Sequence, residues 1–243
     1  MSFAETVAAV DHALATGTRG YVVTPNVDHL VEYERNASYR AACDGAWLRL
    51  ADGMPIVWAS HVLGRPLPAR VAGSDLLPAL CRLAAARGHS IFLLGGQAGV
   101  AERAAARLTA ECPGLRIAGL HAPPAGFDPD GPASEAAVAA VNAVRPALLF
   151  LGLGTPKQEV WLHRRWDRLG ATVAICCGAA IDFAAGVQIR APRWMRDAGL
   201  EWAWRLGRDP RRLWKRYLVR DAAVVGIFLK EWRNARNRPL RKT

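Results

Sequence analysis

The stretch "ALLFLGLGTPKQEVWL", residues 147–162, decides the fold. Its first part is apolar throughout, which predicts a buried strand over 147–152. Two glycines follow, and Pro156 suits the first turn of a helix. A buried strand that turns directly into a helix is the repeating unit of α/β proteins with a parallel sheet.

The same alternation of apolar runs and helix-period stretches occupies most of the chain. Strands are predicted at 20–24, 46–51, 90–95, 115–120, 147–152 and 172–177. Helices are predicted near 3–16, 27–42, 53–63, 74–87, 98–110, 133–144 and 156–169. The pattern predicts an α/β fold with a mostly parallel sheet and helices on both faces. We expect a catalytic body over residues 1–190 and a basic helical C-terminal appendage over 191–243.

The positive charge of the chain lies at its C-terminal end. The net charge of the 243 residues is +11, and residues 190–243 hold 16 lysines and arginines against five acidic residues. The rest of the chain is therefore neutral overall. A basic segment of this kind indicates an anionic partner, which is a nucleic acid, an anionic membrane surface or a phosphorylated substrate.

Cysteine and histidine usage argues against disulfides and metal sites. The five cysteines form no C-x-x-C motif, and the six histidines are scattered, so we expect reduced thiols and no bound metal. The N-terminus has no basic region followed by a long apolar stretch, so no signal peptide is expected. No window reaches the roughly 18–20 apolar residues of a membrane span. These features favour a cytoplasmic location.

Polar residues and glycines gather where the predicted strands end. In parallel sheets, ligands bind beyond the carboxyl ends of the strands. Each residue taken alone is equally well explained as a turn or capping residue, but the set predicts a ligand site. Its members are Thr24, Asn26, Asp28, His29, Asp52, Gly53, Gly95, Gly96, Gln97, Gly154, Thr155, Gln158, Gly178 and Asp182, and Lys157 is a further binding candidate in the same turn as Thr155.

The glycine turns do not match nucleotide-binding fingerprints. A dinucleotide fingerprint needs a third glycine where Lys157 stands, and no glycine-lysine-serine run follows. The loop "LGGQAG" at 94–99 also misses the required spacing. A nicotinamide-dependent dehydrogenase is therefore disfavoured, and no cofactor is expected.

Three longer stretches resemble the signatures of one enzyme family. They are "ADGMPIVWASHVLGRPLPARVAGSDL" (51–76), "LGLGTPKQEVWL" (151–162) and "CGAAIDFAAGVQIRAPRWMRDAGLEWAWRL" (177–206). Together with "TPNVDHL" (24–30), they resemble the WecG/TagA/CpsF glycosyltransferases, glycosyltransferase family 26. The resemblance covers nearly the whole chain, from about residue 20 to 220.

The resemblance implies a Rossmann-like body with a C-terminal appendage. It implies inverting, metal-independent transfer of a hexose, such as N-acetylmannosamine or its uronic acid, from a UDP-sugar. The acceptor would be a saccharide on a polyprenyl diphosphate, typically N-acetylglucosamine on undecaprenyl diphosphate. Such enzymes work peripherally at the inner face of the cytoplasmic membrane, in bacterial surface polysaccharide or teichoic acid synthesis. The donor sugar and the oligomeric state stay open, and a homo-oligomer is not excluded.

The resemblance also implies roles for individual residues. Asp52 matches the family's proposed catalytic base, and Thr24 and Asn26 match the turn that lines the same pocket. Arg70 matches an arginine near the reacting sugar, and Gln158 an active-site glutamine. Two plainer alternatives stay open: Asp52 as the cap of the following helix, and Arg70 as a surface residue.

The remaining candidates are assigned by position. Backbone N–H groups of the "GTPKQE" turn would approach a phosphate or a sugar hydroxyl. Glu159 there would favour the helix dipole, and Asp182 is expected near the uridine. Asp128 and Asp130 have the D-x-D spacing of metal-dependent glycosyltransferases, but their Pro- and Gly-rich surroundings favour a turn.

Two helices, about 194–207 and 211–236, are predicted around Pro210 in the basic segment. Arg212, Arg216 and Arg220 follow at steps of four, and five of the nine tryptophans lie in this region. Such a helix suits an anionic membrane surface, although its apolar face would also suit packing on the body.

Arginines of the segment would stabilise the departing diphosphate, with Arg205, Arg212 and Arg216 as candidates. The hypothesis is that the segment folds over the pocket only at the membrane. The alternative from another class is a nucleic-acid-binding α/β protein with a basic C-terminal arm. The strand-end polar set has no obvious use in such a protein, so a nucleic acid is not the expected partner.

Overall fold

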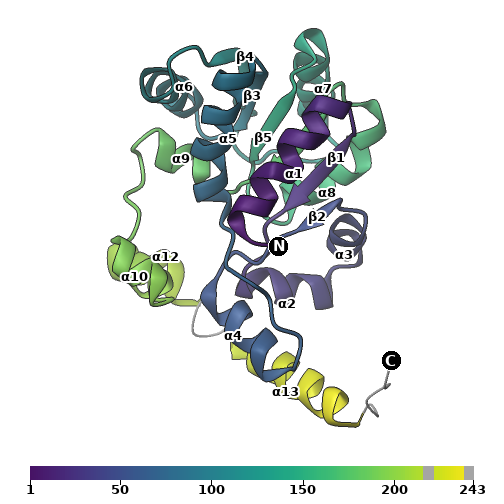
Figure 1. The fold of residues 1–243 in the computed structure, drawn as a ribbon, viewed down its shortest axis with the longest axis vertical. Coiled ribbons are helices and arrows are strands. Elements are labelled where there is room, and N and C mark those ends of the chain that lie inside the picture. Colours follow the sequence, from purple (N-terminus) through teal and green to yellow (C-terminus); the bar gives the residue numbers. More distant parts are fainter. Residues whose placement is uncertain (216–221, 238–243) are drawn as a thin grey trace.

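The protein, described here by a computed structural model for residues 1–215 and 222–237, is built on one parallel sheet (Figure 1). All neighbouring strands pair in parallel, in the order β2-β1-β6-β5-β3-β4. The predicted strands are confirmed with small differences at their ends, except that the strand predicted over 46–51 spans only two residues. Their bounds are β1 Gly20–Val23, β2 Leu48–Arg49, β3 Ser90–Gly95, β4 Arg116–His121, β5 Leu148–Gly152 and β6 Val173–Cys176.

Nine helices accompany the sheet in the first 190 residues. Their bounds are α1 Phe3–Thr16, α2 Val27–Arg35, α3 Ala37–Asp44, α4 Met54–Val62, α5 Gly73–Arg87, α6 Val100–Glu111, α7 Pro132–Val144, α8 Lys157–Arg165 and α9 Ala180–Ala184. The prediction of one helix over 27–42 is wrong. Asn36 has an extended backbone, and its side chain accepts a hydrogen bond from the Tyr39 N–H, so it ends α2 and caps α3.

Helices cover both faces of the sheet because the strand residues alternate between two apolar clusters. On one face, Val22, Leu93 and Ile175 pack with α1, α5, α6 and α9. On the other face, Val23 and Leu94 pack with α3, α7 and α8. The side chains of these strand residues are almost wholly buried. Two buried faces explain why the strands are apolar throughout instead of alternating with polar residues.

Glycines let the ends of two central strands approach each other closely. A Cβ atom on Gly95 would lie 2.5 Å from the carbonyl carbon of Gly152. Gly95 also has a φ of 126°, a region that other residues rarely adopt. The ends of β3 and β5, from which two of the candidate turns start, therefore depend on glycine.

Among the described residues of the C-terminal part, four helices occur: α10 Arg193–Asp197, α11 Glu201–Arg208, α12 Pro210–Lys215 and α13 Ala222–Asn237. Figure 1 shows them at the end of the molecule that carries α2 and α4. The backbone at Gly199 lies directly against Trp58 of α4. Lys230 of α13 lies 3.6 Å from the Glu34 carboxylate of α2. The C-terminal helices therefore contact the helices that follow β1 and β2.

Two of the predicted basic residues, Arg216 and Arg220, lie outside the described residues, as does the side chain of Arg212. Within residues 1–215 and 222–237, no helix is both long enough and apolar enough to cross a membrane.

Candidate active site

Asp52 lies where the chain leaves β2 at the edge of the sheet. Its N–H donates to the Pro25 carbonyl, 2.9 Å away, so the connections after β1 and β2 run side by side. The helix α4 is capped by Gly53 without a side-chain hydrogen bond, so the alternative of Asp52 as a helix cap is wrong. The Asp52 side chain is partly exposed, with 28% of its surface open to solvent.

Arg70 connects Asp52 to two further carboxylates. Its Nη1 atom lies 3.6 Å from Asp52 Oδ1 and 3.7 Å from Glu201 Oε2, while its Nη2 donates to Asp75 Oδ2 at 3.0 Å. Only 13% of the Arg70 side chain is exposed. The alternative of a plain surface arginine is therefore wrong, because the guanidinium joins the body to α11.

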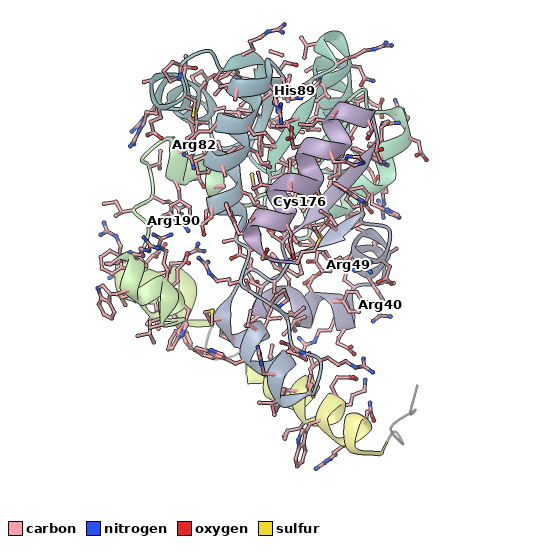
Figure 2. All side chains as sticks on the ribbon, viewed as in Figure 1. Arg40, Arg49, Arg82, His89, Cys176 and Arg190 are labelled. Atoms are coloured by element: carbon pink, nitrogen blue, oxygen red, sulfur yellow. The ribbon has the colours of Figure 1, made fainter. Side chains whose placement is uncertain are left out.

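Asp75, in the first turn of α5, accepts hydrogen bonds from two arginines that follow α9 in the chain. Its Oδ1 accepts hydrogen bonds from Arg190 Nη1 at 2.7 Å and from Arg196 Nη1 at 3.2 Å. Figure 2 shows Arg190 on the segment that connects α9 to α10. Burial alone would raise the pKa of Asp75, but the hydrogen bond from Arg190 and the surrounding guanidiniums lower it. Asp75 is therefore held ionised in the middle of the arginines.

These residues form what we call the arginine cluster: Arg70, Arg190, Arg196 and Arg205 with Asp52, Asp75 and Glu201. Arg205 donates to Glu201 Oε1 at 2.8 Å, and its guanidinium lies 5.3 Å from the centre of the Phe183 ring. The four guanidiniums exceed the three carboxylates by one positive charge. Buried N–H groups without a hydrogen-bond partner occur at Arg190 Nε and Nη2, Arg196 Nε and Arg205 Nε. The arginine cluster therefore has an excess positive charge that attracts an anion, and these covered N–H groups could donate to it once neighbouring side chains move.

The environment of Asp52 gives it the properties of a proton acceptor. Burial raises its pKa to about 6, the Glu201 carboxylate acts in the same direction, and Arg70 and Arg205 oppose them. At neutral pH the carboxylate is mostly ionised but more basic than an ordinary aspartate. A general base works best with a pKa close to the working pH.

The turn after β5 points inward. Gln158 and Glu159 are each 1% exposed, and Gln158 Nε2 donates to Glu159 Oε1 at 2.7 Å. Thr155 Oγ1 donates to the same oxygen at 3.0 Å. Burial raises the pKa of Glu159 to about 7. Gln158 Oε1 and Glu159 Oε2 are buried without a hydrogen-bond partner. In this structure the Gln158 amide therefore binds Glu159, while the neighbouring Lys157 is exposed.

The remaining candidates lie at the carboxyl ends of the strands, between the Asp52 group and the Gln158 group. Thr24 Oγ1 donates to the Cys176 carbonyl at 3.0 Å, and the Asn26 side chain caps α2. Gly178 follows β6, with its carbonyl close against Gly152, and Asp182 accepts a hydrogen bond from Gln188. Since β2 and β5 are separated by β1 and β6, these two strands lie about 14 Å apart. A ligand that contacts both groups must lie across the carboxyl ends of β1 and β6.

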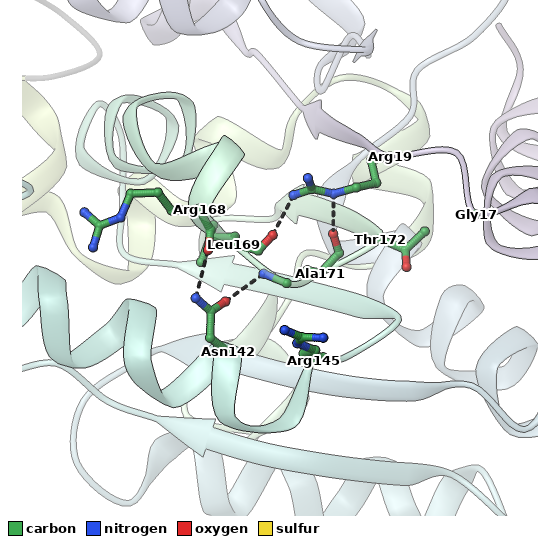
Figure 3. A pocket seen from close by; sticks show the side chains of 9 residues that line it. Gly17, Arg19, Asn142, Arg145, Arg168, Leu169, Ala171 and Thr172 are labelled. Atoms are coloured by element: carbon green, nitrogen blue, oxygen red, sulfur yellow. Dashed lines mark hydrogen bonds between the residues drawn. The ribbon is translucent and has the colours of Figure 1, made fainter.

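A separate hollow of about 410 Å³ lies at the opposite end of the strands, where the chain enters β1 and β6 (Figure 3). Arg19 there donates to the carbonyls of Leu169 and Ala171, at 2.6 and 3.2 Å. Asn142 donates to the Arg168 carbonyl and accepts from the Gly170 N–H. These bonds hold the connection between α8 and β6 in place, which gives this hollow a structural explanation.

The D-x-D motif is a turn. Asp128 Oδ1 accepts a hydrogen bond from the Asp130 N–H at 3.0 Å, and the Asp128 carbonyl accepts one from Gly131. Asp130 forms an ion pair with Arg164 of α8. The prediction that these aspartates shape a turn is confirmed.

Sequence reasoning missed Asp75, Arg190, Arg196 and Glu201 as individual site residues. Three of them lie inside the long signature over 177–206, and Asp75 lies inside the signature over 51–76. The density of arginines in "QIRAPRWMR" was a usable signal. Their shared target could not be found from spacing, because Asp75 precedes Arg190 by 115 positions.

Comparison with known proteins identifies the family of the chain. The profile of the glycosyl transferase WecG/TagA/CpsF family matches residues 1–238. An N-acetylglucosaminyldiphosphoundecaprenol N-acetyl-beta-D-mannosaminyltransferase of Bacillus spizizenii is 30% identical over 218 residues, which cover 89% of this chain and 81% of the relative. A protein of the same name from Staphylococcus aureus is 30% identical over 197 residues, 81% of this chain and 73% of the relative.

Proposed function

The chain belongs to the WecG/TagA/CpsF family of glycosyl transferases, and from that premise we propose its reaction. It transfers N-acetylmannosamine, or a related hexose, from a UDP-sugar to N-acetylglucosamine on undecaprenyl diphosphate. The transfer inverts the anomeric centre, needs no metal ion and serves the synthesis of a surface polysaccharide or teichoic acid. The names of the relatives at 30% identity support this donor and acceptor.

The observation that carries the proposal is the pairing of a partly exposed Asp52 side chain with Arg70. In the proposed reaction, Asp52 accepts the proton of the acceptor hydroxyl as its oxygen attacks the anomeric carbon. The bond from that carbon to the UDP oxygen breaks on the opposite face of the sugar. The raised pKa of Asp52, about 6, supports this role, since a more basic carboxylate takes the proton more readily.

The arginine cluster supplies the charge that the leaving UDP requires. Breaking the glycosidic bond leaves additional negative charge on the diphosphate, and preorganised guanidiniums stabilise it most where water is excluded. Arg190, Arg196 and Arg205 offer buried N–H groups that no other atom uses. Arg190 and Arg196 thus join Arg205, Arg212 and Arg216, the candidates of the sequence-based prediction. The turn with Thr155, Lys157 and Gln158 is proposed to hold the far end of the donor.

A membrane contact by the appendage, residues 191–243, is a further part of the proposal. Trp194 is 65% exposed, and Trp202, Trp214 and Leu229 are also exposed in this basic region. Aromatic and basic residues together suit the interface of an anionic bilayer. We propose that the enzyme binds peripherally at the inner face of the cytoplasmic membrane, where its lipid-linked acceptor resides.

The test is acceptor-dependent release of UDP. The full chain is mixed with UDP-N-acetylmannosamine, UDP-N-acetylglucosamine or UDP-glucose, with and without a polyprenyl-diphosphate-linked N-acetylglucosamine acceptor. The expected result is UDP release with the mannosamine donor only when the acceptor is present, at a rate that a chelator does not change. Absence of acceptor-dependent release with every donor would contradict the proposal.

A further inference from the structure

Glu201 brings a negative charge from the C-terminal part to the proposed catalytic base. It is the first residue of α11, after the Gly199 turn that packs on Trp58 of α4. Its side chain is 20% exposed and lies between two guanidiniums, those of Arg70 and Arg205. The body therefore receives this carboxylate only when α11 is in the place that the structure shows.

Arg70 is shared between Asp52 and Glu201 through a single nitrogen atom. The Nη1 atom lies 3.6 Å from an oxygen of Asp52 and 3.7 Å from an oxygen of Glu201. Both distances exceed the 2.7–3.2 Å of a normal N–H···O hydrogen bond. The other nitrogen, Nη2, is held by Asp75 at 3.0 Å. Arg70 is thus anchored on Asp75 and stands between two carboxylates without closing a tight pair with either.

We propose that Glu201 is a positioning residue for the transfer, because its carboxylate holds Arg70 back from Asp52 and so keeps Asp52 available as proton acceptor. This inference rests on the proposed function of Asp52. A tight, two-point bond between a guanidinium and a carboxylate strongly favours the ionised form of the acid. Without Glu201, Arg70 would be drawn to Asp52 alone, and the base would be weaker.

The charged groups that face Asp52 come from three parts of the chain. Arg70 lies in the connection before α5, the Gly73 N–H opens α5, and Glu201 and Arg205 extend from α11. Burial and Glu201 raise the pKa of Asp52, while Arg70, Arg205 and the Gly73 N–H lower it. If the Glu201 charge is removed, all remaining charged and polar groups around Asp52 lower its pKa, and only burial raises it. The pKa of Asp52 should therefore fall. The strength of the base depends in this way on a helix of the C-terminal part.

The experiment is the pH profile of turnover, measured as UDP release from the full chain with the acceptor. In Glu201→Gln the acidic limb should move down by on the order of half a pH unit, toward the ordinary aspartate range. The rate above the limb should fall because the base is weaker, with little change in the KM for the donor. Glu102→Gln is the matched control, since Glu102 is exposed on α6 and the net charge changes equally.

An acidic limb that stays at the wild-type position in a folded Glu201→Gln protein would overturn the inference. If that variant does not fold by circular dichroism, Glu201→Asp replaces it. The aspartate side chain is shorter by one methylene, so its carboxylate lies farther from Arg70 but keeps its charge. The acidic limb should therefore move in the same direction by less, and an unchanged limb would again overturn the inference. The proposed function is tested separately with Asp52→Asn. If the acidic limb of the wild-type pH profile persists in this variant, Asp52 is not the base, and the proposed function fails.

Discussion

Replacing Glu159 by glutamine should stabilise the protein above pH 7 and change its stability little near pH 4.5. Glu159 is buried in the first turn of α8, and burial raises its pKa from 4.5 to about 7. The folded state therefore prefers the neutral acid, whereas the unfolded chain ionises at the ordinary pKa. The stability that this group contributes is fully present below pH 4.5 and is lost as the pH rises through about 7.

The size of the effect follows from the two pKa values. The difference between 4.5 and about 7 corresponds to roughly 3 kcal/mol, since each pKa unit is worth about 1.4 kcal/mol. Glutamine keeps the oxygen that accepts from Thr155 and Gln158, so these two hydrogen bonds remain. The amide nitrogen of the glutamine would take the place of Glu159 Oε2, which has no hydrogen-bond partner.

The assay is urea denaturation of the wild type and of Glu159→Gln at pH 5 and at pH 8. The free energy of unfolding of the variant should exceed that of the wild type by roughly 3 kcal/mol at pH 8 and by much less at pH 5. Glu102→Gln, at an exposed position, should show no such pH-dependent difference. An equal offset of Glu159→Gln at both pH values would refute the reasoning, because it would mean that Glu159 ionises alike in both states.

Three further predictions concern the frame of the site. Gly95→Ala should cost more than about 2 kcal/mol in urea denaturation, because its Cβ would lie 2.5 Å from the Gly152 carbonyl carbon. Gly99→Ala, with a φ of 79° and open space around it, should cost only about 1 kcal/mol, and equal losses would count against the crowding argument. Asp75→Asn should lower the free energy of unfolding by about 1–2 kcal/mol, because its arginines lose their counterion; the figure is reduced for the 28% exposure of the Asp75 side chain. An unchanged free energy of unfolding would mean that these arginines need no counterion. Deleting residues 195–243 should abolish UDP release and leave a folded body by circular dichroism, and a fully active truncated chain would contradict the role of the C-terminal helices.

The sheet was predictable because its four inner strands, β1, β6, β5 and β3, are apolar on both faces. A strand such as 147–152, whose side chains are apolar on both faces, must be buried on both faces, and in an α/β chain two layers of helices provide that burial. Finer features were not predictable in the same way. The break at Asn36 lies inside a stretch of continuous helical periodicity, so only the cap geometry reveals it. The strand β2 spans two residues instead of six and lies at the edge of the sheet, where it pairs with β1 alone.

The candidate site was predictable in its strand-end positions and less so in its contacts. The nearness of Asp52 and Arg70 agrees with the roles implied by the family resemblance. The inward orientation of Gln158 was not foreseen, since spacing along a helix does not say which side of its first turn faces the core. Arg190 and Arg196 both bind Asp75, which lies more than 100 positions before them in the chain. The local sequence pattern around each residue cannot predict such a long-range ion pair.

The most direct test of Asp52 as proton acceptor is to measure turnover and UDP affinity of Asp52→Asn side by side. Asparagine keeps the shape of the side chain but takes no proton. Turnover should fall by a factor on the order of 100 to 10,000, while the Kd for UDP from titration calorimetry stays within about twofold of the wild type. Loss of UDP binding together with turnover, or turnover close to that of the wild type, would contradict the role of Asp52 as the base.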